Sequence, residues 1–282
     1  MSKVTVITDS TAYLPQDLVE KYGITVCPQV LIWGEETFED GIDIMPDEFY
    51  KRLSTATVMP STSQVTPAYF TKVYKEQQAQ GNEMLAVLVS TKLSGTIASA
   101  IQAKDQMPDV TLEIVDSNTI AMALGFHALT AARAANDGAS LEECKALAEK
   151  AREHTGVVFA VDTLEFLHRG GRIGGANRFL GTALNIKPLL EVVGGRVEAI
   201  ERVRTRKKSI NRLLELVEER IAGRTPLRLA TLHANAPDEA KELLIRAEEM
   251  FDVEESFLTE VSPVVGTHAG PGTVGLAYMA GM

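Results

Sequence analysis

The sequence has few of the residues that build disulfide frameworks, metal sites or membrane spans. It contains two cysteines, Cys27 and Cys144, which form no C-x-x-C pair, and its histidines form neither an H-E-x-x-H motif nor a Cys/His cluster. These absences predict reduced, buried thiols and no zinc site. No apolar run approaches the ~20 residues of a membrane span. The first ten residues, MSKVTVITDS, lack the apolar core and cleavage site of a signal peptide, so we expect a cytoplasmic protein.

Positive charge is outweighed by negative charge. The chain has 28 lysines and arginines against 38 aspartates and glutamates, a formal net charge of −10. We therefore expect no nucleic-acid partner and at most transient contact with a membrane, because nucleic acids and membrane surfaces are anionic. With 282 residues, 45% hydrophobic and 23% charged, the chain is typical of a globular protein and is long enough for two domains.

The first half of the chain alternates between strand-like and helical segments. Apolar runs of strand length occur at residues 4–7, 24–32, 84–89 and 110–115. Helical patterns lie between and after them, beginning near Pro15, Pro46, Pro67 and Ser94, and an alanine-rich helix runs to Ala135. A capping box at Ser140–Glu143 opens one more helix, to about Glu153. This alternation predicts an α/β fold with a parallel sheet flanked by helices.

The second half has a different pattern. Residues 186–193, the pair Gly194-Gly195 and residues 196–204 predict a β-hairpin. Helices at 206–221 and 237–250 and strands at 227–232 and 253–259 follow. Hairpins mixed with helices predict an α+β domain with a mixed, partly antiparallel sheet. We place the boundary near residue 157, which gives an N-terminal domain at residues 1–157 and a C-terminal domain at residues 158–282.

Hydroxyl-bearing residues gather next to the predicted strands. They occur in Asp9-Ser10-Thr11, Ser61–Gln64, Ser90-Thr91, Ser94-Gly95-Thr96 and Asp116-Ser117. Ligands of open α/β sheets bind at the carboxyl ends of the strands, and hydroxyl donors beside helix N-termini favour anions. These segments predict an anion site at one edge of the sheet. The alternative for each of them is a simple helix cap.

A glycine-rich segment near the end of the chain, GTHAGPGTVG, holds a single histidine. It lacks the lysine of a Walker motif, and its glycines do not have the G-x-G-x-x-G spacing. We interpret Gly266–Gly275 as a loop that lets the backbone approach a ligand closely. His268 is then either a ligand contact or a structural residue, and the sequence favours neither.

Two basic segments lie in the second half. Thr163–Gly174 has an apolar helical turn that runs into a Gly-Gly bend flanked by arginines. Arg202, Arg204 and Arg206 would share one face if the hairpin strand continued through them. Such a run is either a solvated edge or a docking patch for a partner that carries negative charge.

Short motifs along essentially the whole chain resemble the DegV family, whose members include the FakB fatty-acid-binding proteins. The motifs are T-D-S-T (Thr8–Thr11), S-T-S-Q (Ser61–Gln64), L-S-G-T (Leu93–Thr96), V-D-S (Val115–Ser117), L-x-x-L-x-R-G-G-R-I (Leu164–Ile173), I-K-P-L-L (Ile186–Leu190) and H-A-G-P-G (His268–Gly272). One departure is Val65-Thr66-Pro67, where many relatives place proline directly after the glutamine. It is expected to shift the helix start and to leave Thr62 in place.

The resemblance implies a DegV-like two-domain fold with a single long-chain fatty acid between the domains. The alkyl chain would be buried in one domain, and the carboxylate would lie at the interdomain cleft. By resemblance, Thr62, Ser94 and His268 contact the carboxylate, and Arg172 is a weaker candidate.

The resemblance also implies a partner. Arg204 matches a basic position that serves a separate, DhaK-like fatty acid kinase, and Arg202 belongs to the same basic run. That kinase phosphorylates the bound carboxylate with ATP and magnesium, and the acyl phosphate feeds phospholipid synthesis. In this interpretation the chain is a lipid carrier rather than an enzyme, and it holds no cofactor or metal of its own.

Two other functions are compatible with the residues. Ser94, then Asp116 or Asp162, then His268 follow the chain order of an α/β-hydrolase triad, which predicts a serine acyl hydrolase. Against it, Lys92–Thr96 lacks the first glycine of the G-x-S-x-G elbow. The third function is a scaffold or regulator whose pocket is filled by side chains. Candidate pocket residues, which core packing explains equally well, are Ile97, Ile101, Met122, Phe126, Phe159 and Phe166.

Overall fold

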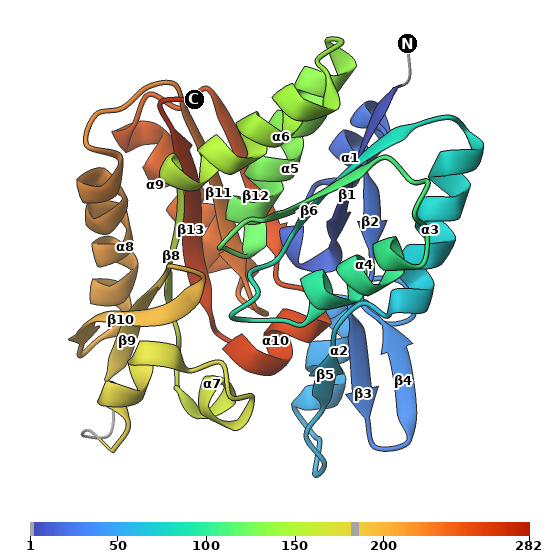
Figure 1. The fold of residues 1–282 in the computed structure, drawn as a ribbon. Coiled ribbons are helices and arrows are strands. Elements are labelled where there is room, and N and C mark those ends of the chain that lie inside the picture. Colours follow the sequence, from blue (N-terminus) through green and yellow to red (C-terminus); the bar gives the residue numbers. More distant parts are fainter. Residues whose placement is uncertain (1–2, 182–185) are drawn as a thin grey trace.

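The N-terminal half builds a parallel sheet, as predicted (Figure 1). In the computed structural model, which describes residues 3–181 and 186–282, four strands pair in parallel in the order β2-β1-β6-β7. Their bounds are Val4–Asp9 (β1), Thr25–Cys27 (β2), Glu83–Leu88 (β6) and Leu112–Asp116 (β7). Every residue of β1 is buried, as expected for a parallel strand covered on both faces.

Helices cover both faces of this sheet. On one face lie α3 (Pro67–Ala79) and α4 (Thr96–Asp105), which pack through residues such as Phe70 and Ile97. On the other lie α1 (Gln16–Tyr22), α5 (Ala121–Asn136) and α6 (Leu141–Lys150), together with the 3-10 turn η1 (Ser10–Ala12). The predicted capping box is present at the start of α6, and the helix after Gln64 begins at Pro67 with Thr66 as its N-cap.

The C-terminal half builds a mixed sheet of six strands in the order β10-β9-β8-β13-β11-β12. Neighbouring strands are antiparallel except β11 and β12, which run parallel. The bounds are Thr155–Ala160 (β8), Lys187–Val193 (β9), Arg196–Val203 (β10), Leu227–His233 (β11), Glu255–Glu260 (β12) and Val274–Ala280 (β13). Helices α8 (Arg206–Ile221) and α9 (Pro237–Met250) pack on one face, and α5 contacts the other. The predicted fold class is therefore confirmed.

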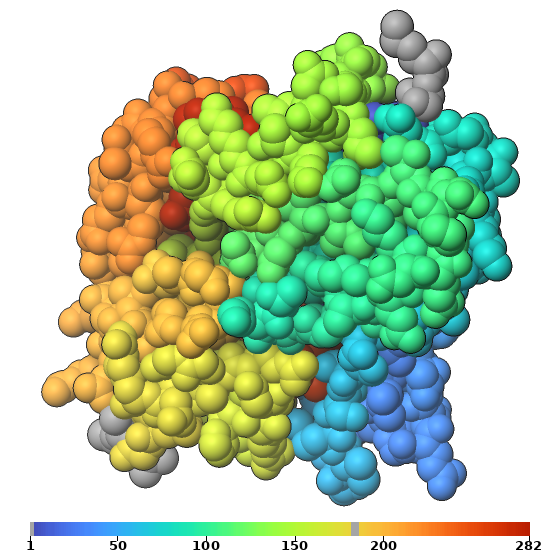
Figure 2. All heavy atoms as spheres, in the orientation of Figure 1, coloured from blue at the N-terminus to red at the C-terminus, as the bar shows by residue number. Residues whose placement is uncertain are grey.

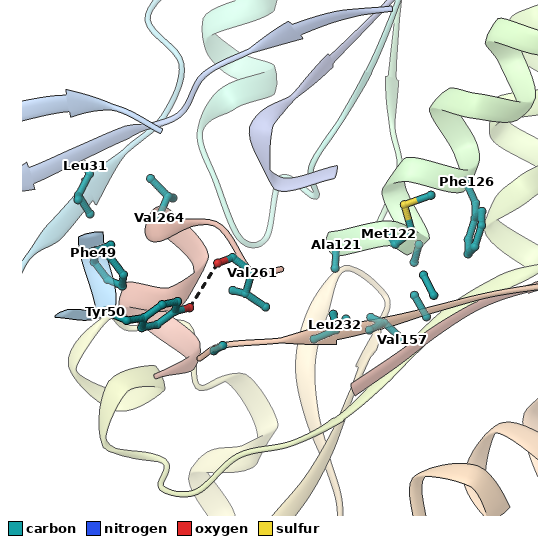
Figure 3. Packing of buried hydrophobic residues seen from close by; sticks show 14 of the residues in the cluster. Leu31, Phe49, Tyr50, Ala121, Met122, Phe126, Val157, Leu232, Val261 and Val264 are labelled. Atoms are coloured by element: carbon teal, nitrogen blue, oxygen red, sulfur yellow. Dashed lines mark hydrogen bonds between the residues drawn. The ribbon is translucent and has the colours of Figure 1, made fainter. Parts of the chain in front are cut away.

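A small third sheet joins the two halves. Strands β3 (Val30–Trp33), β4 (Glu36–Glu39) and β5 (Ser61–Ser63) pair antiparallel in the order β4-β3-β5. Helix α2 (Pro46–Leu53) follows β4, and α10 (Pro263–Ala269) contacts both β3 and β5. Leu31 and Phe49 from this region share one hydrophobic cluster with Val261 and Val264 from the C-terminal half (Figure 3).

Several predicted elements differ from the structure. Helices α8 and α9 have their predicted bounds, but β4, β5, β8 and β13 were not expected as strands. The segment GTHAGPGTVG is no continuous loop, because its first residues belong to α10 and its last ones to β13. Strand β10 ends at Val203, so Arg206 begins α8 and does not continue the face of Arg202 and Arg204.

The division of the chain into domains 1–157 and 158–282 stays a prediction. Residues 157 and 158 both lie inside β8, an interior strand of the six-stranded sheet. Residues 1–2 and 182–185, which the two predicted domains include, lie outside the described residues.

Candidate functional site

A cavity lies between the two large sheets, and residues from both halves of the chain line it. Its empty space, including the open mouth, is about 860 Å³. Most of the lining is apolar, and Figure 3 labels five of these residues: Ala121, Val157, Leu232, Val261 and Val264.

Polar side chains from four separate segments meet in this cavity. Thr62 comes from β5, Ser94 precedes α4, Arg172 follows the short helix α7 (Glu165–Arg169), and His268 lies near the end of α10. These are the four residues that the sequence singled out for a carboxylate, and the structure brings all of them to the cavity lining. Thr62, Arg172 and His268 also line an adjoining hollow with Phe166. Figure 2 shows atoms of the red C-terminal region at the base of this hollow.

His268 is a partly buried, neutral side chain whose Nδ1 atom is fully buried. Its Nε2 lies 2.8 Å from Thr62 Oγ1, and Nδ1 has no hydrogen-bond partner among the described residues. Burial, and to a smaller degree the Arg172 guanidinium, lowers the pKa of His268 from 6.5 to about 4. At neutral pH the imidazole therefore carries one ring proton and no charge.

Gly170 makes room for His268, although the two residues are 98 positions apart. A Cβ added at Gly170 would lie 2.7 Å from His268 Cε1 and 3.1 Å from Cγ, with Nδ1 closer still. Glycine is thus required at Gly170 of the Gly-Gly bend, because a side chain there would occupy the space of the imidazole. The segment of residues 170–172 supplies both the space for the imidazole and a guanidinium beside it.

Ser94 is held by a chain of hydrogen bonds. Gln29 Nε2 donates to Thr96 Oγ1 at 2.8 Å, and Thr96 Oγ1 lies 2.9 Å from Ser94 Oγ. Either hydroxyl can donate in the Ser94–Thr96 pair. If Thr96 donates, the Ser94 hydrogen is free to donate into the cavity. Gln29 also lines the cavity. No local pattern marks Gln29 as a site residue, because its partner Thr96 is 67 residues away.

Arg172 is fixed by the backbone. Nε donates to Leu93 O at 3.0 Å and Nη1 to Gly170 O at 2.8 Å. Within residues 3–181 and 186–282, Nη2 has no protein partner and is the part of the guanidinium left to bind a ligand. The cavity therefore offers two hydroxyls, one neutral imidazole and one cation as its polar groups at this point.

The glycines of GTHAGPGTVG pack closely against side chains of other segments, and the close approach of their backbone to a ligand stays a prediction. An added Cβ would lie 2.5 Å from Tyr50 Oη at Gly266, 2.8 Å from Phe166 Cγ at Gly270 and 3.0 Å from Asp162 Cγ at Gly272. At Gly275 it would lie 2.7 Å from Phe159 Cβ. Each glycine thus accommodates a side chain from elsewhere in the protein.

Most of the other hydroxyls at the sheet edge have structural partners. Ser10 Oγ donates to Asp40 at 2.6 Å, and Thr11 Oγ1 donates to Asp9 at 2.6 Å. Thr91 Oγ1 donates to Asp116 at 2.7 Å. Ser10 and Thr91 thus bond to carboxylates 30 and 25 positions away, so the helix-cap alternative does not describe them. From the predicted anion segments, Thr11, Thr62, Ser63, Gln64 and Ser94 line the cavity.

The candidate pocket residues divide into three groups. Phe159 lines the cavity, and Phe166 lines the adjoining hollow. Ile97, Met122 and Phe126 are buried in hydrophobic clusters and do not line the cavity, and Ile101 is 46% exposed.

No hydrolase triad is assembled among the described residues. Ser94 Oγ bonds to Thr96, His268 Nε2 bonds to Thr62, and His268 Nδ1 has no carboxylate partner. Asp116 bonds to Thr91 and the Asn118 backbone, and Asp162 bonds to Lys187. A triad requires the histidine to bridge the serine and an acid, so this geometry does not support the hydrolase.

Arg202 and Arg204 lie outside the cavity and are exposed. Arg202 Cζ lies 5.0 Å from the centroid of the Phe179 ring. Arg204 follows β10 and has no hydrogen-bond or ion-pair partner within the described parts of the chain. It is the cation of this run that remains open to a partner.

In residues 3–181 and 186–282, no helix combines the length and apolar character that a membrane crossing needs. The same residues contain no group of three or more His, Cys, Asp or Glu side chains placed to hold a metal ion.

An apolar cavity with a few converging polar groups is typical of proteins that bind a small amphiphilic molecule. The chain belongs to the DegV family, because the model of that family, described as an uncharacterised protein, matches residues 3–281. It is 40% identical over 275 residues to a DegV domain-containing protein of Streptomyces coelicolor, with 97% of each chain covered.

Solved structures of similar chains are described as fatty-acid-binding proteins. A DegV family protein of Thermus thermophilus, described by its fatty acid binding, superimposes with a TM-score of 0.93 at 36% identity over 99% of both chains. DegV of Bacillus subtilis, described as a fatty acid binding protein, has a TM-score of 0.89 at 30% identity over 99% of this chain and 100% of the other.

Proposed function

We propose that this protein binds a single long-chain fatty acid in the cavity, with the carboxylate at Thr62, Ser94 and His268. The observation that carries the proposal is the convergence of these three polar side chains on an otherwise largely apolar cavity. The fatty-acid-binding descriptions of the Thermus and Bacillus relatives support it. The acid then lies between the two predicted domains.

The energetics favour such a ligand. Burial of a ~16-carbon chain at roughly 0.8 kcal/mol per CH₂ gives on the order of 12 kcal/mol of gross transfer free energy. Lost chain freedom and association entropy offset much of this gain. A carboxylate buried without partners would cost more than the remainder, so the polar groups of the cavity decide whether the acid binds.

Two hydrogen-bond relays aim donors at the carboxylate. A neutral His268 protonated at Nε2 donates to Thr62 Oγ1, which frees the Thr62 hydrogen for one carboxylate oxygen. In the second relay, Gln29 donates to Thr96 and Thr96 donates to Ser94, which frees the Ser94 hydrogen for the carboxylate. Arg172 Nη2 adds a weaker contact. Because the hydroxyls are neutral, the carboxylate oxygen keeps more nucleophilic character than it would in a buried lysine ion pair.

We further propose that the protein is a carrier for a separate fatty acid kinase, as in the FakB proteins. The kinase supplies ATP and magnesium. A carboxylate oxygen attacks the γ-phosphoryl group, the bond to the β-phosphate oxygen breaks, and acyl phosphate and ADP result. The acyl phosphate then enters phospholipid synthesis in the cytoplasm. Arg204 and Arg202 form the docking site, a role that the exposure of both side chains supports.

Extraction of the purified protein with organic solvent, followed by mass spectrometry, tests the binding step. We expect one fatty acid per chain. Thr62→Ala, Ser94→Ala and His268→Ala should each lower occupancy without unfolding the protein, because each removes a carboxylate donor or the group that orients it, at about 1.5–3 kcal/mol per charged hydrogen bond. Ser54→Ala, which removes an exposed hydroxyl outside the cavity, is the matched control.

The outcomes of this experiment separate the alternatives. Unchanged occupancy in all three variants would place the carboxylate elsewhere. An empty extract, repeated after incubation with a mixture of fatty acids, would refute the carrier proposal and favour the scaffold.

A further inference from the structure

Tyr13 separates the cavity from a groove on the protein surface. Its side chain lines the cavity together with Val261 and Val264, and it lines the groove together with Ser262 and Pro263. Neighbouring residues of one segment thus face opposite hollows. Tyr13 is the residue that the linings of the two hollows share. The groove has about 760 Å³ of empty space, including its open side.

Packing holds the Tyr13 ring in the wall between the cavity and the groove, and its hydroxyl lies near Ser262. Its backbone has a φ of 56°, in the left-handed region, where it ends the turn η1. Such a φ is uncommon for a bulky residue and marks a position that the surrounding structure enforces. Neither the buried Tyr13 hydroxyl nor the buried Ser262 hydroxyl has a hydrogen-bond partner among the described residues.

The groove suits the methyl end of a hydrocarbon chain better than a carboxylate. Leu14, Met45 and Leu258 line it, and the last two side chains are 55% and 44% exposed. Glu260 also lines the groove, and burial together with the nearby Asp47 raises its pKa. A second carboxylate placed there would meet like charge. The polar groups at Thr62 and His268 therefore fix one end of the ligand, and the Tyr13 wall suits the other.

We infer that Tyr13 is a specificity-determining residue that limits acyl chain length by closing the cavity against this groove. The inference rests on the proposed fatty-acid-binding function. A chain that fits the cavity ends at the ring, and a longer one is blocked by it. With the ring removed, the extra methylenes extend into the apolar groove between Leu14, Met45 and Leu258.

Competition among saturated fatty acids tests this inference. Wild type, Tyr13→Ala and Tyr13→Phe are each loaded from an equimolar mixture of 14- to 20-carbon acids, and the bound acids are extracted and weighed by mass spectrometry. We expect the ratio of 20- to 16-carbon acid to rise about tenfold or more in Tyr13→Ala, since each buried CH₂ contributes a factor of about four. Tyr13→Phe keeps the ring and should match wild type. Tyr13→Leu repeats the test if the alanine variant fails to fold.

The outcomes distinguish this inference from the function beneath it. An unchanged ratio in a folded Tyr13→Ala or Tyr13→Leu would overturn the role of the ring while leaving fatty-acid binding intact. A Tyr13→Phe ratio shifted as far as that of Tyr13→Ala would assign the effect to the hydroxyl and overturn it as well. No bound acid in wild type would overturn the proposed function itself.

Discussion

The packing of Gly170 against His268 predicts the effect of a single added methyl group. Gly170 has φ −75° and ψ −6°, which alanine adopts without strain, so Gly170→Ala tests space alone. The new Cβ would lie 2.7 Å from His268 Cε1, whereas carbon atoms prefer about 3.5–4.0 Å. Because Nδ1 would lie closer still, the imidazole must retreat by more than about 1 Å. Such a shift lengthens the 2.8 Å contact between Nε2 and Thr62 Oγ1 beyond hydrogen-bond range.

Gly170→Ala should lower both the free energy of unfolding and the affinity for fatty acid. Overpacking of this kind costs about 1–3 kcal/mol of folding free energy. If Thr62 loses its orientation as well, fatty-acid affinity should fall by about ten- to a hundredfold, the effect of one charged hydrogen bond. Urea unfolding of the lipid-free protein measures the first quantity, and titration with a fluorescent fatty acid measures the second.

A double-mutant cycle decides whether the clash with His268 is the cause. In the His268→Ala background the imidazole is absent and the added methyl group fits the vacated space, so Gly170→Ala should cost little there. Gly171→Ala is the control for backbone effects, because that residue has φ +70° and nothing within 4 Å of its added Cβ. Equal costs of Gly170→Ala in both backgrounds would refute the reasoning.

Two further predictions concern pH and kinase docking. The pKa of His268 is about 4 in the folded state against an ordinary 6.5, so as pH falls the unfolded chain takes up the extra proton first and folding stability decreases. Between pH 7 and 5.5 the lipid-free wild type should lose about 1 kcal/mol more free energy of unfolding, measured in urea, than His268→Gln. Equal losses of stability in the two proteins would contradict the lowered pKa of His268. Arg204→Glu should abolish acyl phosphate formation with a fatty acid kinase and leave the amount of bound fatty acid unchanged. Arg196→Glu, which changes another exposed arginine, should retain acyl phosphate formation. Normal phosphorylation of the fatty acid bound to Arg204→Glu would exclude the docking role of Arg204.

The regular elements could be predicted where local signals were strong. Helix α9 begins at Pro237, and α8 begins after the N-cap Thr205 and ends before Gly223, so their bounds follow from neighbouring residues. Strand β5 has no such signal. Its residues Ser61–Ser63 are extended because they pair with β3, which lies 30 residues earlier in the chain. A serine- and threonine-rich stretch after a proline predicts a loop on local grounds.

The residues of the candidate site could be named from the sequence, but their arrangement in space could not. Thr62, Ser94 and His268 entered through family motifs, and the cavity unites them. The residues that support them could not be predicted from the sequence. Gln29 acts on Ser94 through Thr96, and Gly170 acts on His268 from a distant segment. Glycine-rich composition suggested ligand contact at residues 266–275. Only the folded chain shows that the neighbours of these glycines are protein side chains.

The tethering of α10 at both ends has a consequence for how the molecule unfolds. Asp40 accepts a hydrogen bond from Val264 N at 3.0 Å near the start of the helix, and His268 bonds to Thr62 near its end. Residues separated by more than 200 positions are thus tied together at each end, and neither half of the sequence holds a complete pair. A ligand at this site binds only when both halves are folded. At a concentration of 100 times its Kd it would add about 2.7 kcal/mol to the stability of the whole chain, which merges the melting of the two halves into one cooperative transition.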